Sequence, residues 1–326
     1  MIAQAMVLSF LLSLAALFVL LSRFGSRLVL DRPNERSLHE RPVPRTGGIA
    51  VLAGASVSLA LGAEALWLTA LLAAALAVLS LLDDVFSVPT LVRLAAHLAA
   101  AGLVVWYLLS PMHPAALIVL ALAVAWITNL YNFMDGADGI AGGMALIGFG
   151  AYTLGAVLAG DVALATLCAA LAAASAAFLL RNFHPARIFL GDVGSIPLGF
   201  LAAALGIMGW RDDAWPLWFP LLVFGPFIGD ATVTLLKRLL RRERVWRAHR
   251  EHYYQRMVRM GLGHRRTACL GYLIMLGCAA AALSARTQTP EVQAMAFAGA
   301  SAVLGALALW VDSRWARFER ESRGGA

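Results

Sequence analysis

The sequence is a succession of long apolar runs separated by short polar segments. About 20 consecutive apolar residues cross a bilayer as an α-helix, and runs of that kind recur along almost the whole chain. The pattern predicts an all-α, polytopic membrane protein with one integral-membrane domain, residues 1–326. We predict eleven transmembrane spans, at 3–22, 47–63, 65–82, 91–109, 114–131, 140–159, 162–180, 195–210, 215–236, 267–285 and 292–312.

Composition supports the membrane assignment and excludes other classes of protein. Hydrophobic residues make up 61% of the 326 positions, whereas charged residues make up only 14%. A soluble domain of this size cannot bury that much apolar surface, and its charged fraction is usually about 25%. A soluble enzyme, a disordered chain and a disulfide-rich secreted scaffold are therefore all excluded.

The basic residues predict how the chain is oriented. All but two of the 26 Lys and Arg residues fall in segments on one side of the predicted membrane, the exceptions being Arg211 and Arg286. Cytoplasmic loops collect Lys and Arg, so we expect the N-terminus outside and the C-terminus in the cytoplasm. The same rule explains the net charge of +7, so no nucleic-acid partner is expected.

The first of five cytoplasmic polar segments, residues 31–48, alternates charged residues with Pro and Gly. It ends at Arg45 and at Gly47 and Gly48, where a helix is expected to start. Arg side chains and free backbone N–H groups at a helix start bind phosphate, so we expect a phosphate-binding loop that includes His39. The alternative is a basic loop that touches anionic lipid.

The second segment is the pair Asp83 and Asp84 at the end of an apolar run. Adjacent carboxylates repel each other and are costly near lipid, and a cation beside them removes that cost. We therefore expect metal or phosphate chemistry here. A solvated helix end is the alternative.

The third segment places Asn129, Asn132, Asp135 and Asp138 three residues apart. Residues with this spacing share one helix face, and the glycines that follow the two Asp residues let the backbone approach a ligand. Amides beside carboxylates can bind a base or sugar together with a hard cation. The alternative is a tight turn.

The fourth segment, residues 182–195, contains Arg187 and reaches Gly-Asp192-Val-Gly-Ser at the start of the next span. Asp192 is a candidate metal ligand at a helix N-terminus, and a plain N-cap is the alternative. The fifth segment carries His249 and His252 on one helix face. We expect it to face a diphosphate; a zinc site or a basic helix on the membrane surface are the alternatives. Asp230 is an acid within a span and is a functional candidate for that reason.

Six carboxylates are thus expected at one membrane face among Arg and His residues, namely Asp31, Asp83, Asp84, Asp135, Asp138 and Asp192. Carboxylates mixed with phosphate-binding cations indicate Mg²⁺ and a phosphorylated substrate. The chain has no GxxxxGK[ST] loop for ATP and no GxSxG, HExxH or GxGxxG motif. An enzyme that moves a phosphoryl group between a soluble nucleotide and a lipid fits this pattern.

Taken in order, these segments resemble the polyprenyl-phosphate N-acetylhexosamine-1-phosphate transferase family, of the glycosyltransferase family 4 type. The resemblance rests on the Pro/Arg/Gly-Gly loop, the Asp83-Asp84 pair, the Asn132-Phe-Met-Asp-Gly-Ala-Asp-Gly motif, the Gly191-Asp-Val-Gly-Ser motif and the late His segment. It implies transfer of N-acetylhexosamine-1-phosphate from a UDP-sugar to undecaprenyl phosphate, which releases UMP. It further implies Mg²⁺, for which Mn²⁺ is a substitute, a bacterial cytoplasmic (inner) membrane and an active site on the cytoplasmic face.

The resemblance also implies roles for individual residues. Catalytic roles fall to Asp83, Asp84, Asp135, Asp138, His249 and His252. The metal ligands are Asp192 and Asp135. Substrate-binding roles fall to Asn129, Asn132, Arg45, Gly47, Gly48, Arg187, Arg250 and Arg256.

Two departures separate the chain from the branch of the family that makes peptidoglycan precursors. That branch carries a run of three histidines where this chain has His249-Arg-Glu-His252, and a Lys shortly after the Asp pair where this chain has Val85-Phe-Ser-Val. The pattern favours the branch that initiates O-antigen or exopolysaccharide synthesis. The alternatives are the phospho-N-acetylmuramoyl-pentapeptide transferase of that peptidoglycan branch and, in another class, a proton-coupled transporter. Whether the protein forms a homodimer is left open.

Overall fold

The computed structural model describes the chain apart from residues 23–28, 32–37, 39–41, 246–248 and 325–326. Most of the described residues are helical, and nine helices among them are long and apolar enough to cross a membrane. This confirms the prediction of an all-α, polytopic membrane protein. The long helices are α1 (Ile2–Leu20), α3 (Trp67–Phe86), α4 (Thr90–Leu109), α5 (Pro114–Phe133), α6 (Ile140–Ala159), α7 (Val162–Asn182), α8 (Asp192–Arg211), α12 (Gly263–Ala285) and α13 (Pro290–Gly324).

Two of the eleven predicted spans correspond to shorter elements. The span predicted at 47–63 is α2 (Gly47–Ser56), which continues as the 3₁₀ turn η2 (Val57–Ala60). The span predicted at 215–236 is divided at Phe224 into α9 (Trp218–Val223) and α10 (Gly225–Leu240). The total of eleven spans and their orientation remain predictions.

Five short elements complete the described part of the chain. The 3₁₀ turn η3 (Glu64–Leu66) precedes α3, and α11 (Tyr253–Met257) is joined to α12 by the π-helical turn η4 (Val258–Leu262). The strands β1 (Leu30–Asp31) and β2 (Val43–Pro44) pair antiparallel, so that Leu30 lies opposite Pro44.

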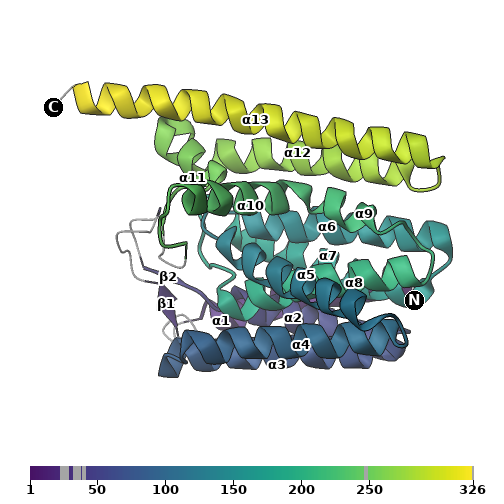
Figure 1. Cartoon of the computed structure of the whole chain (residues 1–326). Coiled ribbons are helices and arrows are strands. Elements are labelled where there is room, and N and C mark those ends of the chain that lie inside the picture. Colours follow the sequence, from purple (N-terminus) through teal and green to yellow (C-terminus); the bar gives the residue numbers. More distant parts are fainter. Residues whose placement is uncertain (23–28, 32–37, 39–41, 246–248, 325–326) are drawn as a thin grey trace.

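The long helices lie side by side, and the N- and C-termini lie at opposite ends of the bundle (Figure 1). The β1–β2 hairpin and α11 gather at one end, as do the last residues of α3 and α5 and the first residues of α8. Polar segments that are far apart in the sequence therefore meet at this end.

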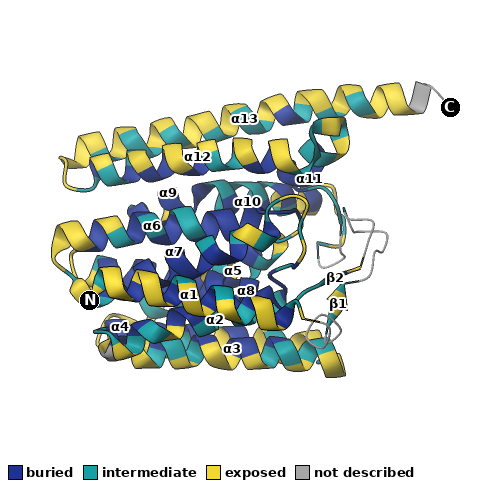
Figure 2. Ribbon diagram, turned by 180° about the vertical axis from the view of Figure 1, so that it is seen from behind, coloured by how far each residue is buried: buried dark blue, intermediate teal, exposed yellow. Residues whose placement is uncertain are grey.

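Burial differs strongly between the helices. Helix α8 and most of α7 are buried, whereas α13 is largely exposed along the outside of the bundle (Figure 2). Small residues allow the tight central packing: a Cβ atom on Gly199 would lie 2.7 Å from the Cβ atom of Tyr131 on α5. The start of α8, which carries Asp192, is consequently fixed by the most densely packed part of the protein.

Backbone hydrogen bonds attach the β1–β2 hairpin to the segment that precedes α8. The N–H of Phe189 donates to the carbonyl of Pro44 at 2.7 Å, and the N–H of Arg45 donates to the carbonyl of Val29 at 3.0 Å. Gly191 has a φ of +70°, and a Cβ atom there would lie 2.1 Å from the carbonyl oxygen of Arg45. Only glycine fits this contact, which places Arg45 beside Asp192.

Candidate active site

A cavity of about 210 Å³ opens at the end of the bundle where the polar segments meet. Its walls come from the first, third, fourth and fifth polar segments of the sequence. The lining residues are Asp31, Leu38, Arg45, Asn132, Asp135, Gly136, Ala137, Asp138, Phe189, Gly191, Asp192, Gln255 and His264. The structure thus brings together Arg45, Asn132, Asp135, Asp138 and Asp192, which were singled out from the sequence.

Asp192 is the first residue of α8, and a neighbouring amide orients its carboxylate. The Nδ2 of Asn132 donates to Asp192 Oδ1 and to Ser195 Oγ, both at 2.9 Å. The hydroxyl of Ser195 in turn donates to the carbonyl of Gly191 at 3.1 Å. The N-terminus of a helix also stabilises an anion, so the Asp192 carboxylate is held in one orientation at the cavity wall.

Asp135 lies in the loop between α5 and α6 and faces the same cavity. Burial raises the pKa of Asp135 well above its usual range, and the charge of Asp192 raises it further. A hydrogen bond from the Gly191 N–H acts in the opposite direction. Two neighbouring carboxylates repel each other when both are ionised. A cation bound between them offsets this repulsion, so the pair suits a cation.

Asp84 approaches the site through Arg45. The Nη2 of Arg45, a residue of the cavity lining, lies 2.7 Å from Asp84 Oδ1. The second oxygen, Oδ2, is buried and has no hydrogen-bond partner among the described residues. A buried carboxylate oxygen without a donor is costly unless a cation or ligand meets it. Asp83 instead pairs with Arg93 of α4 at 2.6 Å, so the two acids of the pair have different partners.

These oxygen donors suit a hard divalent cation. Mg²⁺ prefers carboxylate oxygens together with the phosphate oxygens of a substrate. Asp135 and Asp192 line the cavity, and Asp84, which pairs with the lining residue Arg45, has one oxygen without a hydrogen-bond partner among the described residues. The residues present therefore fit Mg²⁺, with Asn132 as the amide that holds Asp192.

Gly47 and Gly48 do not supply the free phosphate-binding N–H groups that we expected. Their N–H groups donate to the carbonyls of Phe189 and Leu190, both at 2.9 Å. A Cβ atom on Gly48 would lie 2.2 Å from the Cα atom of Gly194. The glycines let the start of α2 pack directly against the start of α8. This expectation was wrong because backbone pairing had already used the donors.

Asp138 forms a hydrogen-bonded wall of the cavity with two histidines. Its Oδ2 lies 2.6 Å from His184 Nδ1 and accepts from the Ala186 N–H at 3.1 Å. The Nδ1 of His264 accepts from the Asp138 N–H at 3.2 Å, and its Nε2 lies 3.1 Å from the Leu38 carbonyl. The ligand atoms of these three side chains lie within 4.8 Å of one another. Because hydrogen bonds already use both nitrogens of His264, we regard the cluster as part of the cavity wall and not as a metal site.

His252 lies beside the cavity, behind Phe133, and is not among the cavity-lining residues. Its ring stacks on that of Phe133, with centroids 6.4 Å apart, and its Nδ1 lies 3.1 Å from Asp230 Oδ1. The carboxylate of Asp230 also accepts from the N–H groups of Tyr253 and Tyr254, at 2.9 and 3.1 Å. Asp230 therefore caps α11 and orients His252, which explains the acid inside a predicted span.

His249 is neutral in its surroundings. Burial lowers its pKa to about 4, and the neighbouring His252 and Arg238 lower it as well. Its Nδ1 lies 3.3 Å from the backbone N–H of Glu251 and accepts from it, so the ring proton is on Nε2. A neutral His with a free N–H can donate a hydrogen bond to a phosphate oxygen.

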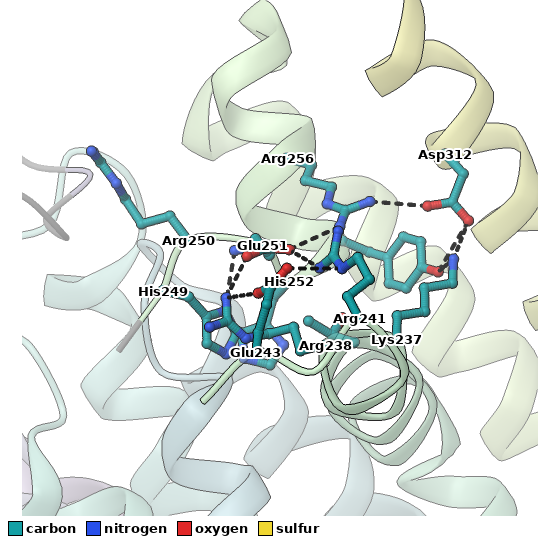
Figure 3. Close-up of polar contacts among 12 residues, drawn as sticks. Lys237, Arg238, Arg241, Glu243, His249, Arg250, Glu251, His252, Arg256 and Asp312 are labelled. Carbon is teal, nitrogen blue, oxygen red and sulfur yellow. Dashed lines mark hydrogen bonds and ion pairs between the residues drawn. The ribbon is translucent and has the colours of Figure 1, made fainter. Parts of the chain in front are cut away.

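The remaining residues singled out from the sequence lie away from the cavity. Asn129 contacts His97, with 3.1 Å between Oδ1 and Nδ1. Arg187 lines a separate cavity of about 540 Å³ beside Tyr272. Arg250 points away from the ion pairs around Glu251 (Figure 3), and Arg256 pairs with Asp312. His39 lies outside the described residues.

Two residues at the site escaped prediction, and for different reasons. His264 follows the last recognised motif and lies in a basic stretch with no pattern around it. His184 stands in the fourth segment, but nothing in the sequence shows that it contacts Asp138. Only the packing of α7 and α12 against α6 brings these histidines together.

Comparison with known proteins identifies relatives of this chain. The Glycosyl transferase family 4 model matches residues 66–210. The decaprenyl-phosphate N-acetylglucosaminephosphotransferase of Mycobacterium tuberculosis is 30% identical over 341 residues, which cover 89% of this chain and 83% of that protein. The probable undecaprenyl-phosphate N-acetylglucosaminyl 1-phosphate transferase of Bacillus subtilis is 28% identical over 82% of this chain and 81% of its own.

A third relative matches only a part of the chain. The phospho-N-acetylmuramoyl-pentapeptide-transferase of Staphylococcus carnosus is 35% identical over 98 residues, or 29% of this chain and 30% of that protein. The long matches are to transferases that act on polyprenyl phosphates, and they bear out the resemblance seen in the sequence motifs. The chain belongs to the polyprenyl-phosphate hexosamine-1-phosphate transferase family and is a membrane-embedded phosphotransferase.

Proposed function

We propose that the protein transfers N-acetylhexosamine-1-phosphate from a UDP-sugar to undecaprenyl phosphate in a Mg²⁺-dependent reaction. One observation carries the proposal. Asp135, Asp192 and Arg45, which forms an ion pair with Asp84, line one cavity at the end of a membrane helix bundle. Carboxylates beside an Arg suit a metal-bound diphosphate, and the membrane position suits a lipid acceptor.

The proposed reaction is a displacement at phosphorus. An oxygen of the lipid phosphate attacks the β-phosphorus of the UDP-sugar, and the bond from that phosphorus to the bridging oxygen breaks. UMP leaves with the bridging oxygen, and the lipid carries the diphospho-sugar. The second pKa of a phosphate monoester is about 6, so the acceptor is already mostly ionised at neutral pH. No strong base is therefore required. Asp83 and Asp84 can instead hold the arginines with which they pair, Arg93 and Arg45.

Asp192 and Asp135, with the free oxygen of Asp84, would hold the metal ion. When bound, Mg²⁺ supplies positive charge that offsets the charge developing on the diphosphate. Arg45 is proposed to bind the acceptor phosphate, because its ion pair with Asp84 fixes its guanidinium at the cavity. Asn132 keeps the Asp192 carboxylate in one orientation.

The histidine segment is proposed to bind the donor diphosphate. The Nε2–H of His249 is a neutral donor. Asp230 contacts His252 through Nδ1, so this contact does not involve His252 Nε2. Neutral donors stabilise phosphate oxygens without forming a fixed ion pair that would retain the product. We propose that this segment stabilises the negative charge that develops on the leaving UMP.

The donor is proposed to be a UDP-N-acetylhexosamine, with UDP-N-acetylglucosamine as the first candidate, because the relatives with long matches are named for N-acetylglucosamine transfer. The product would prime a cell-surface polysaccharide such as O-antigen at the cytoplasmic face of the inner membrane. Peptidoglycan precursor synthesis is the second candidate, but the match to that enzyme covers only 29% of the chain.

An assay of UMP release tests the proposal. Purified protein in detergent would receive undecaprenyl phosphate, Mg²⁺ or Mn²⁺ and one donor from a panel of UDP-N-acetyl sugars that includes UDP-N-acetylmuramoyl-pentapeptide. We expect UMP only when the lipid, the metal and one N-acetylhexosamine donor are all present. Asp212→Asn, which changes an acid paired with the neighbouring Arg211, is the matched control for acid-to-amide variants at the cavity.

Each alternative predicts a different outcome. UMP release with the muramoyl-pentapeptide donor alone would assign the peptidoglycan reaction. UMP release that persists in excess chelator would overturn the metal requirement. Absence of UMP with every donor, from protein that elutes as a single folded species, would overturn the proposed function as a whole.

A further inference from the structure

One carboxylate of the outermost helix of the bundle, Asp312, makes several polar contacts to the histidine segment and to α10. Asp312 of α13 accepts from Arg256 Nη1 at 2.9 Å and from the Tyr253 hydroxyl at 3.3 Å, and it also pairs with Lys237. The Nζ of Lys237 in turn donates to the Tyr253 hydroxyl at 2.7 Å. Figure 3 shows Lys237 of α10 and Arg256 of α11 pointing toward Asp312 of α13.

A second set of ion pairs continues from Arg256 toward the histidines. Glu251 lies between His249 and His252 and pairs with Arg238, with Arg241 at 2.5 Å and with Arg256 Nη2 at 3.7 Å. Burial acts to raise the pKa of Glu251, but Arg241 and Arg238 outweigh burial and lower it. Arg256 therefore links the carboxylate of α13 to the carboxylate that separates the two histidines.

The burial of Arg256 makes these partners necessary. Its side chain is only 7% exposed, and a buried charge without a partner is strongly destabilising. The position of Asp312 along α13 suits this role. It lies 22 residues after Pro290, or about 33 Å along a helix axis, and so near the boundary of a hydrocarbon core about 30 Å thick. A carboxylate there can meet cations from the cytoplasmic loops.

The side chains of α13 are mostly exposed or half-buried. Of its residues from Pro290 to Ser322, Val311 is the only one that is buried. Trp315, one turn after Val311, lies under the guanidinium groups of Arg256 and Arg259, whose carbons are 5.7 and 4.7 Å from the ring centroid. Asp312 and Trp315 therefore connect α13 to the histidine segment, while earlier residues of α13 pack on α12 and α9.

We propose that Asp312 is a positioning residue for the proposed transfer reaction. It holds Tyr253 and Arg256 of α11. In this way it keeps His252, the residue directly before α11, at the diphosphate site. Asp230 anchors the start of α11 from the membrane side, and Asp312 anchors its outer face. Asp312 touches neither the cavity nor a substrate. The inference rests on the proposed function, because it assigns the diphosphate to the histidine segment.

The variant Asp312→Asn tests the proposal, because it keeps the shape of the side chain and removes its charge. Misplacement of a binding group by about 1 Å can reduce turnover about 100-fold. We expect kcat for UMP release to fall about 10- to 100-fold, with the KM for undecaprenyl phosphate changed less than threefold. Asp312→Glu, which keeps the charge, should recover most of the loss, and Asp212→Asn should behave as wild type.

Trypsin sensitivity supplies a readout that does not depend on activity. The segment from Arg241 to Arg250 contains several arginines, and an unanchored segment is cleaved faster than an anchored one. We expect Asp312→Asn to be cut there several-fold faster than wild type and Asp212→Asn, with no change in cleavage elsewhere. Tyr253→Phe, a milder change, should reduce kcat about threefold.

The outcomes separate this inference from the proposed function. Wild-type kcat and wild-type cleavage in both Asp312→Asn and Tyr253→Phe would overturn the positioning role while the transfer reaction stands. A rise in the KM for undecaprenyl phosphate at unchanged kcat would also overturn it. If the wild-type protein released no UMP, the proposed function would fail, and faster cleavage of Asp312→Asn would then show a structural anchor without a catalytic role.

Discussion

The two sides of the candidate site are built in different ways. On the carboxylate side, Asp135 and Asp192 are fixed by the buried start of α8, by close glycine contacts and by the amide of Asn132. On the histidine side, the five-residue helix α11 is held by two carboxylates, Asp230 of α10 and Asp312 of the largely exposed α13. The first side is rigid because of packing, and the second depends on charge.

This difference suits the chemistry that we propose for each side. Metal ligands need a fixed geometry, which a densely packed helix start provides. A segment that binds the donor and then releases UMP needs some freedom to move, which ion pairs near the membrane surface allow. Variants on the two sides should therefore fail differently.

Asp192→Asn should have the largest effect. It removes the charge of a proposed metal ligand and keeps its shape, so we expect turnover to fall at least about 1000-fold while the protein is still inserted in the membrane. UMP release and a gel-filtration profile would measure both properties. Turnover within tenfold of wild type would remove Asp192 from the metal site.

Asn132→Ala should show how far the carboxylate side depends on orientation. Loss of the amide leaves the Asp192 carboxylate without its 2.9 Å partner, and loss of a partner that orients a ligand typically costs 10- to 100-fold in activity or metal affinity. We expect a loss in that range that higher Mg²⁺ partly restores. If added Mg²⁺ did not restore activity, the amide would act on the substrate and not on Asp192.

Asp230→Asn should affect the histidine side more moderately. The variant keeps one acceptor oxygen at the start of α11, replaces the other with an NH₂ donor and removes the charge that caps α11 and orients His252. We expect kcat to fall about tenfold with no change in the Mg²⁺ concentration that gives half-maximal activity. A shifted Mg²⁺ requirement would mean that the two sides are not independent.

The smallest effect should be a pH dependence of stability that comes from His249. Its pKa is about 4 in the folded protein and about 6.5 when exposed. Between these values the unfolded chain binds more protons, so the free energy of unfolding decreases as the pH falls from 6.5 to about 4. Because the residue is only half-buried, solvent screening reduces the contribution to about 1 kcal/mol.

His249→Gln removes this titration and should make the thermal midpoint less sensitive to acid. We expect the wild type to lose about 2 °C more than the variant between pH 7 and pH 4.5. Thermal unfolding in detergent, followed by intrinsic fluorescence, would measure the difference. Equal losses would indicate that His249 titrates normally in the folded protein.

The fold class and the charged residues of the cavity could be predicted from the sequence. Features that depend on contacts between distant segments could not. Apolar periodicity is a local property, so the long helices were evident, although the break at Phe224 between α9 and α10 was not. Asn132, Asp135 and Asp192 were recognised because each stands in a motif. Gly47 and Gly48 were misassigned because sequence cannot show that their N–H groups pair with the segment before α8.

For the same reason, the partners of the arginines and acids on the histidine side could not be predicted from the sequence. Arg256 follows two histidines, and its position in the sequence suggested a phosphate ligand. The structure uses it to join Glu251 to Asp312, an acid more than 50 residues later on another helix. Asp230 attracted attention as an acid inside a span, but only the fold reveals that it caps α11.

The most direct test of the two-sided account is the Mg²⁺ dependence of UMP release in three proteins: wild type, Asn132→Ala and Asp230→Asn. The account predicts that Asn132→Ala needs about tenfold more Mg²⁺ for half-maximal activity, whereas Asp230→Asn keeps the wild-type requirement and loses only maximal rate. Equal Mg²⁺ requirements in all three proteins, or a higher requirement in Asp230→Asn alone, would contradict the assignment of the metal to the carboxylate side.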